Sequence, residues 1–159
     1  MTFLILEFGT GGNGAAPLGD IAASLVSVDE LLRDLAAIAA YPSSVEYRNI
    51  EVAAIEMRSP LKVTLSLFAI SPEAVKAFQE ICRDIILYRE RRERDVIPDE
   101  RDWDDVSAAR LESIKAALAI APAGDQPAMT APEAERLRRH MLTLRNAAIP
   151  LTRVEMKEG

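Results

Sequence analysis

The segment LKVTLSLF, residues 61–68, decides the fold that we predict for this chain. Its apolar positions alternate with polar ones: Leu61, Val63, Leu65 and Leu67 against Lys62, Thr64 and Ser66. Because successive side chains of a β-strand point to opposite faces, this period of two predicts a strand with one face in the core and one in water. Directly after it, Ser71-Pro72-Glu73 has the cap and first-turn residues of a helix. We therefore expect the strand to lie beneath a helix that runs from Pro72 to about Arg94.

Three other segments carry strand patterns. Thr2 to Phe8 is a short apolar run that ends abruptly in glycines, which predicts a buried strand. Glu46 to Arg58 is expected to pair with the strand at 61–68 across a turn at Ser59-Pro60, because proline lacks a backbone donor and suits a turn. Ile149 to Met156 is compatible with a last strand.

Apolar residues at three-and-four spacing predict helices in the remaining segments. The stripe from Leu18 to Ala40 predicts one long helix, continuous or bent at Ser27, because Ser27 and Glu30 have the spacing of a capping box. Two later helices are expected: one capped by Asp99 or Asp102 and carrying Trp103, Val106, Leu111, Ile114 and Leu118, and one over roughly Ala131 to Asn146.

Together these segments predict an α+β fold, with a small, mainly antiparallel sheet of about three to five strands packed against about four amphipathic helices. The chain has 159 residues, of which 49% are apolar. This is the usual size of one domain, and it supplies enough apolar side chains for a core. We therefore expect residues 1–159 to form a single domain.

Composition and charge favour some compartments and partners over others. The single Cys82 cannot make an internal disulfide, and no secretory signal or membrane-spanning run is evident, so we expect a soluble protein of a prokaryotic cytoplasm without a membrane partner. The net charge of −6 makes this an acidic protein. Nucleic acid is therefore a disfavoured partner, because a general binder needs a positive surface to displace counterions from phosphates.

A glycine-rich segment follows the first predicted strand. Gly9, Gly11 and Gly14 fit the spacing G-x-G-x-x-G, in a setting where backbone amides can cradle a pyrophosphate. Asn13-Gly14 favours a tight hairpin, which would allow a short return strand around Ala15 to Pro17. Because Leu32 occupies the region of an acidic ribose ligand and the alternating strands of a dinucleotide fold are missing, we interpret the segment as a turn and keep nucleotide or anion binding as an alternative.

A basic run lies at the end of the helix that begins at Pro72. It contains Arg89, Arg91, Arg92 and Arg94, interspersed with Glu90 and Glu93. Pairs four residues apart, such as Arg89 with Glu93, stabilise an exposed helix by roughly 0.2 to 0.5 kcal/mol each. The same arginines would suit an acidic partner or an RNA backbone, with a second basic patch at Arg136, Arg138, Arg139 and His140.

Signatures of catalysis and metal binding are weak. An acidic group has the residue type of a cation site, but it lacks the glycine and distal glutamate of a calcium loop, and helix capping explains it better: Asp99, Glu100, Asp102, Asp104 and Asp105. One histidine, His140, and one cysteine do not make a common zinc site. Cys82 lies on an apolar helix face, where a buried hydrophobe is commoner than a nucleophile. We therefore expect no catalytic residues, no metal and no cofactor.

The leading hypothesis is a non-enzymatic protein-interaction or oligomerisation module. The helix from Pro72 to Arg94 is apolar on one face and densely charged at its far end, so its last turns are expected to project beyond the sheet and meet a partner. That partner is either a second copy of the chain or a larger protein to which the domain is an accessory. Two alternatives remain: anion binding at the glycine segment, and RNA binding at Arg89 to Arg94.

Overall fold

A computed structural model describes residues 1–10, 15–40, 45–93, 100–118 and 129–159. Its elements, in chain order, are β1 (Thr2–Phe8), α1 (Leu18–Ala40), the 3₁₀ turn η1 (Tyr47–Asn49), β2 (Ile50–Glu56), β3 (Leu61–Leu67), α2 (Pro72–Glu93), α3 (Glu100–Leu118), α4 (Ala131–Arg145) and β4 (Leu151–Glu158). The predicted α+β class, with a small antiparallel sheet and four α-helices, is confirmed.

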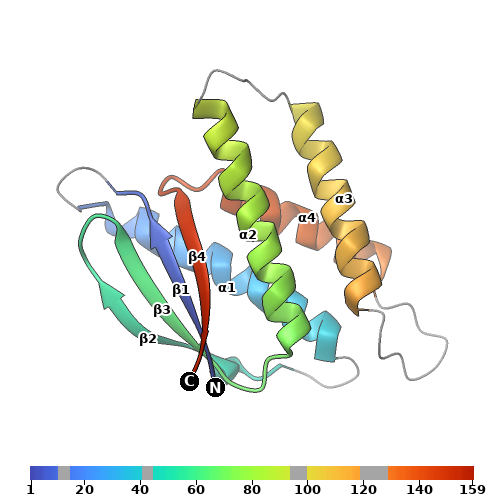
Figure 1. Cartoon of the computed structure of the whole chain (residues 1–159), viewed down its shortest axis with the longest axis horizontal. Coiled ribbons are helices and arrows are strands. Elements are labelled where there is room, and N and C mark those ends of the chain that lie inside the picture. Colours follow the sequence, from blue (N-terminus) through green and yellow to red (C-terminus); the bar gives the residue numbers. More distant parts are fainter. Residues whose placement is uncertain (11–14, 41–44, 94–99, 119–128) are drawn as a thin grey trace.

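The four strands form one antiparallel sheet in the order β2-β3-β1-β4. The first strand of the chain therefore lies in the middle, between β3 and the last strand (Figure 1). The two ends of the chain meet, and Gly159 N donates to Met1 O at 3.0 Å. The strands β2 and β4 are the two edges of the sheet.

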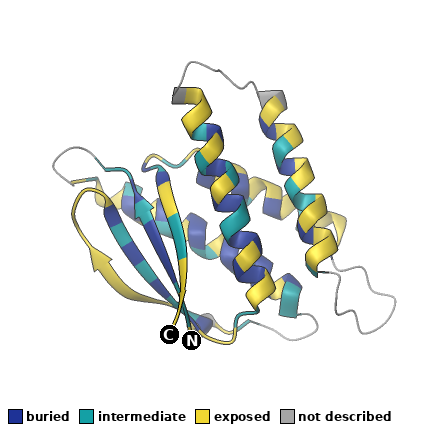
Figure 2. Cartoon of the chain, in the orientation of Figure 1, coloured by how far each residue is buried: buried dark blue, intermediate teal, exposed yellow. Residues whose placement is uncertain are grey.

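The core lies between the sheet and the helices. The strand at Leu61–Leu67 buries its four apolar side chains and leaves the polar ones half-buried, as the alternation predicted. Leu4, Leu6 and Phe8 of β1 are fully covered on the same side. Figure 2 shows the buried positions of α1 and α2 turned inward and exposed positions turned outward. Sheet and helices thus share one apolar cluster.

The ends of the helices follow local rules in most places. Ser71 accepts a hydrogen bond from Ala74 N at 3.2 Å, which confirms it as the cap of α2. Thr130 and Glu133 form a capping box at the start of α4. Ser27 does not cap anything: its hydroxyl donates to Ala23 O at 3.0 Å, and α1 is continuous through this position. Asp102 lies inside α3 and is not its cap, while Asp99 lies outside the described residues.

Two predicted strand segments differ from the structure. Ala15 to Pro17 forms no strand, because β1 is already paired on both sides, with β3 and with β4. The segment predicted to be extended from Glu46 begins instead with η1. Asn49 accounts for this turn, because its side chain accepts from Glu46 N and donates to Phe68 O at 2.8 Å. The turn delivers the chain to β2 beside the end of β3.

The helix α2 runs alongside β4 and extends beyond the end of the sheet, as predicted, where α3 lies next to it (Figure 1). The projecting end is therefore partly covered by this chain itself. None of the helices, within the described residues, combines the length and the apolar character that crossing a bilayer requires.

Candidate functional site

The basic end of α2 contributes to a cavity of about 410 Å³ near the end of α4. Arg89 and Arg92 enter it from α2, because residues three apart lie on one helix face. Arg145, the last residue of α4, and the following Asn146 form the opposite wall. We call these four residues, with Tyr88 and Ala147, the arginine pocket. The sequence indicated Arg89 and Arg92 but missed Arg145 and Asn146.

Arg145 is held against two aromatic rings. Its guanidinium carbon lies 5.0 Å from the ring centroid of Tyr88 and 5.0 Å from that of Trp103. The two rings meet edge to face, with centroids 5.3 Å apart. Trp103 is buried, as expected from its place in the predicted apolar stripe of its helix. Such stacking restricts the rotation of Arg145 and presents its charge in a fixed position.

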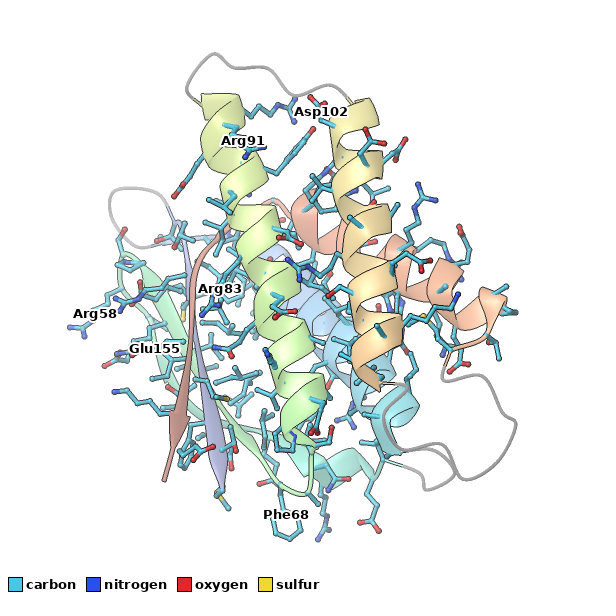
Figure 3. All side chains as sticks on the ribbon, turned by 45° about the vertical axis from the view of Figure 1, so that its right-hand side comes forward. Arg58, Phe68, Arg83, Arg91, Asp102 and Glu155 are labelled. Carbon is cyan, nitrogen blue, oxygen red and sulfur yellow. The ribbon has the colours of Figure 1, made fainter. Side chains whose placement is uncertain are left out.

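Arg91, which belongs to the same predicted patch, is not among the residues that line the arginine pocket. Arg91 turns toward α3, where it lines a smaller cavity of about 110 Å³ together with Asp84 and Asp102. Figure 3 shows Arg91 and Asp102 at the neighbouring ends of α2 and α3. Arg94 lies outside the described residues, as does the predicted pairing of Arg89 with the side chain of Glu93. Helical geometry thus divides the basic run between two faces of α2.

The glycine segment is described only in part. Gly11 and Gly14 lie outside the described residues. Gly9 N donates to Pro150 O at 2.8 Å, and a Cβ at Gly9 would lie 3.3 Å from side-chain atoms of Pro150 and Thr152. Gly9 therefore has a packing role, because it lets the end of β1 approach the start of β4.

Most charged residues singled out in the later helices join helices to one another. His140 Nδ1 lies 2.6 Å from Asp34 Oδ2, and Arg136 Nε lies 3.1 Å from Asp34 Oδ1, so both link α4 to α1. Arg138 pairs with Asp104 of α3 at 3.2 Å. Within the part of the chain that the structure describes, no group of three or more histidine, cysteine or acidic side chains is arranged to hold a metal.

A cluster of partly buried charged side chains between α2 and α3 was not predicted from the sequence. Arg110 Nε and Nη2 donate to the two oxygens of Asp84 at 2.6 and 3.0 Å, and Nη1 donates to Glu80 at 3.0 Å. The hydrogen bond to Asp84 is the main cause that raises the pKa of Arg110. The four-residue spacing of Glu80 and Asp84 was visible in the sequence, but Arg110 is too distant in the chain for a local pattern to identify it.

Cys82 is fully buried on the inner face of α2. Burial raises the pKa of its thiol well above the ordinary range, and the nearby charge of Asp84 adds to this effect. A thiol that stays protonated is a poor nucleophile and a poor metal ligand. The Cys82 side chain therefore acts as a small apolar residue packed in the core.

An apolar groove of about 360 Å³ separates α1 from β2. Leu25 and Val26 of α1 form one wall, and Ile50 and Val52 of β2 form the other, with Leu65 among the lining residues. Sequence reasoning missed this groove. The available signal was Val26, an apolar residue beside the predicted helix stripe.

The comparisons with known proteins add no relative. No family model, no curated protein and no solved structure matches this chain significantly. Functional inference therefore depends on the two surfaces described above, the arginine pocket and the α1–β2 groove.

Proposed function

We propose that the chain is a non-enzymatic oligomerisation module that pairs with a second copy of itself through the free edge of β2. The observation that carries this proposal is the exposure of β2, an edge strand in which every residue from Glu51 to Glu56 is exposed. Val52 is 54% exposed and Ile55 is 44% exposed. An uncovered strand edge with apolar side chains is a template for pairing with another strand.

The groove extends this apolar edge onto α1. Val52 and Ile55 lie opposite Leu65 and Val63 of β3, on the side of the sheet that faces the helices. None of the described helices covers them there, and Val26 of α1 is likewise exposed. Removing this continuous surface from water favours association, because transfer of apolar surface out of water lowers the free energy.

The strand is complementary to itself in an antiparallel, twofold arrangement. When Ala53 of one copy lies opposite Ala54 of the other, Val52 lies opposite Ile55 twice, once on each side of the axis. Apolar pairs of this kind each stabilise a sheet by roughly 0.2 to 1 kcal/mol relative to alanine. Small alanines at the axis allow the two backbones to approach.

Charge supports the same register. Glu51 of one copy would lie opposite Glu56 of the other. Glu56 already forms ion pairs with Arg58 at 3.3 Å and with Lys62 at 3.7 Å. These three side chains together have a net positive charge, and Glu51 of the second copy would lie beside them. The carboxylate of the second copy therefore approaches a site of opposite sign.

The other edge of the sheet is a weaker candidate. α2 runs alongside β4, and charged residues, Arg153, Glu155 and Lys157, occupy that strand. Charged side chains and a covering helix are the usual protection of an edge against pairing. A prokaryotic cytoplasm remains the proposed place of assembly, and a single buried Cys82 is consistent with that compartment.

The test is the mass in solution across a dilution series. Light scattering coupled to size exclusion is expected to give twice the chain mass of 17.4 kDa for the wild type at about 100 μM, with dissociation on dilution. Val52→Lys and Ile55→Lys place a charge in the contact, so both variants are expected to remain at the mass of one chain.

Leu87→Lys is the matched control, because Leu87 is a similarly exposed apolar residue of α2, where it lines the small cavity beside α3. It is expected to dimerise like the wild type. Circular dichroism establishes that all four proteins are folded. A wild type that is monomeric at about 100 μM, or a Leu87→Lys variant that dissociates as the β2 variants do, overturns the proposal.

A further inference from the structure

We propose that Met57 of the second copy closes and fills the α1–β2 groove when two chains pair. This inference rests on the proposed pairing of the β2 edges, and it names the side chain that the groove receives. Met57 directly follows β2 and is 61% exposed. Figure 1 shows β2 ending at the outer side of the sheet, away from α2, α3 and α4. Met57 is therefore accessible to a second copy.

The register that pairs Val52 with Ile55 also decides where Met57 lies. Continued by two residues along both chains, it places Met57 of the second copy opposite Ile50. Because residues two apart in an extended chain point to the same face, Met57 shares the helix-facing side with Ile55. Ile50 and Val52 both line the α1–β2 groove. The second copy therefore adds Ile55 and Met57 along the open side of the groove.

Twofold symmetry places both grooves on the same face of the joined sheet. Identical edges that pair antiparallel are related by an axis perpendicular to the sheet, so α1 of each copy lies on one common face. Neighbouring strands lie about 4.8 Å apart. Met57 of the second copy is thus one strand away from Ile50, on the side where Leu25 and Val26 of α1 form the facing wall.

The chemistry of the groove suits a methionine. Its lining is mostly apolar, and the charged residues in it are Asp29, Arg33 and Glu51. Arg33 Nε donates to Asp29 at 2.9 Å and Arg33 Nη1 donates to Glu46 O at 3.2 Å, so these two charges already interact within one chain. A methionine side chain is unbranched and flexible, and it fills irregular apolar space. The apolar part of the groove is the part that Met57 covers.

The structural alternative is a solitary exposed methionine at the end of a hairpin. Arg58 N donates to Glu56 O at 3.0 Å, so Met57 is the middle residue of a tight turn, and turns of this kind are common where strands end. Single exposed apolar residues need no partner. Met57 is not single in this sense, because the register brings it to a groove lined by Val26 and Val52, which are also exposed.

The first experiment is a cysteine cross-link in the full chain. The double variant Ile50→Cys with Met57→Cys is oxidised with copper phenanthroline and separated on a non-reducing gel. It is expected to give a covalent dimer, because directly opposite residues of antiparallel strands lie within the distance that a disulfide bridges. Seven residues along one strand span about 23 Å, so neither an internal bridge nor a bridge between equal positions is expected. Each single variant is therefore expected to remain one chain.

The second experiment measures the dissociation constant of the dimer by light scattering across a dilution series. Met57→Ser removes an apolar side chain from both grooves and is expected to raise this constant at least about tenfold. Met57→Leu keeps an apolar side chain of similar volume, so it is expected to weaken the dimer less. Met156→Ser is the matched control, because Met156 is an exposed methionine of β4, the other edge of the sheet. Its effect is expected to be less than about twofold.

The outcomes distinguish this inference from the proposed function. A wild type that is monomeric at about 100 μM overturns both. A wild-type dimer that Met57→Ser matches in affinity overturns the inference alone, and so does a double cysteine variant that gives no covalent dimer. An equal loss of affinity in Met156→Ser and Met57→Ser also overturns it, because the effect would then not depend on the groove.

Discussion

At the residue scale, Arg110 is the residue of α3 that links this helix to two carboxylates of α2. Its side chain is 24% exposed, and it holds Asp84 and Glu80 together through three hydrogen bonds. Arg110→Ala leaves two carboxylates facing each other without a cation, so we expect the free energy of unfolding to fall by about 2 kcal/mol. Urea denaturation followed by circular dichroism measures this loss.

Arg138→Ala is the control for that measurement. Arg138 also joins two helices, but its side chain is 43% exposed and makes a single contact with Asp104. Exposed pairs contribute at most about 1 kcal/mol, so this variant is expected to be the milder one. Equal losses for Arg110→Ala and Arg138→Ala would contradict the structural distinction between them.

Cys82 predicts a loss of stability at alkaline pH. The ordinary pKa of a thiol is about 8.5, and burial raises the pKa of Cys82 in the folded chain. Above about pH 8.5 the unfolded chain therefore releases a proton that the folded chain retains, and stability falls by up to about 1.4 kcal/mol per pH unit. Below that pH the thiol is protonated in both states and contributes no pH dependence.

The measurement compares the wild type with Cys82→Ala by urea denaturation, in reducing buffer, at pH 7.5 and pH 9.5. Tyrosines and lysines titrate in both proteins, so only the difference reports the thiol. The wild type is expected to lose about 1 kcal/mol more than the variant over this interval. The same pH dependence in both proteins would show that Cys82 ionises normally in the folded state.

Only some residues of the arginine pocket could be predicted from the sequence. Arg89 and Arg92 were identified because they lie in a dense basic run. Arg145 stands alone in the sequence, and its relation to Tyr88 and Trp103 exists only after α2, α3 and α4 have packed. A contact between residues so far apart in the chain leaves no local pattern.

At the scale of elements, α4 is attached to α1 through Asp34, whose two carboxylate oxygens lie 3.1 Å from Arg136 Nε and 2.6 Å from His140 Nδ1. Asp34→Ala removes the carboxylate beside both side chains while leaving the apolar contacts of Leu137, Met141 and Leu144 in place. We expect a loss of about 1 to 3 kcal/mol, concentrated in α4. Hydrogen exchange read by mass spectrometry is expected to show that α4 exchanges faster in Asp34→Ala than in the wild type, while the exchange of β1 is the same in both.

Asp29→Ala is the matched control on the same helix. Asp29 is more exposed than Asp34 and pairs with Arg33, one turn further along α1, at 2.9 Å. A pair of this kind contributes about 0.5 kcal/mol, and its loss is not expected to change exchange in α4. Accelerated exchange of α4 in Asp29→Ala, or its absence in Asp34→Ala, would contradict the assignment of Asp34 as the link.

Elements with strong periodicity were predicted well, and β2 shows where such prediction ends. The segment VAAI, residues 52–55, has no regular alternation, because the register against β3 shifts between Val52 and Ala54. A bulge adds one residue to a strand and reverses the order of inward and outward side chains beyond it. The exposure of Val52 and Ile55 depends on which helices cover the sheet, which the strand's own sequence does not contain.

At the scale of the whole molecule, stability is expected to decline from the centre of the sheet to its β2 edge. β1 is paired on both sides, and Leu4, Leu6 and Phe8 are fully buried. The fold class was predictable because the apolar residues of each segment have the spacing of either a strand or a helix. The strand order was not predictable, since it depends on the last strand pairing with the first, two segments from opposite ends of the chain.

The exchange of backbone amides at the β2 edge is expected to depend on protein concentration. In a single chain the outward amides of β2 have no strand beside them, so they exchange rapidly with solvent, while amides of β1 exchange only when the sheet opens. Pairing with a second copy gives the outward amides acceptors. Exchange of β2 in the wild type is therefore expected to slow at about 100 μM relative to about 1 μM, with β1 unchanged. In Val52→Lys the exchange of β2 is expected to be rapid at both concentrations, and slowing that appears in α2 or β4 instead would place the contact elsewhere.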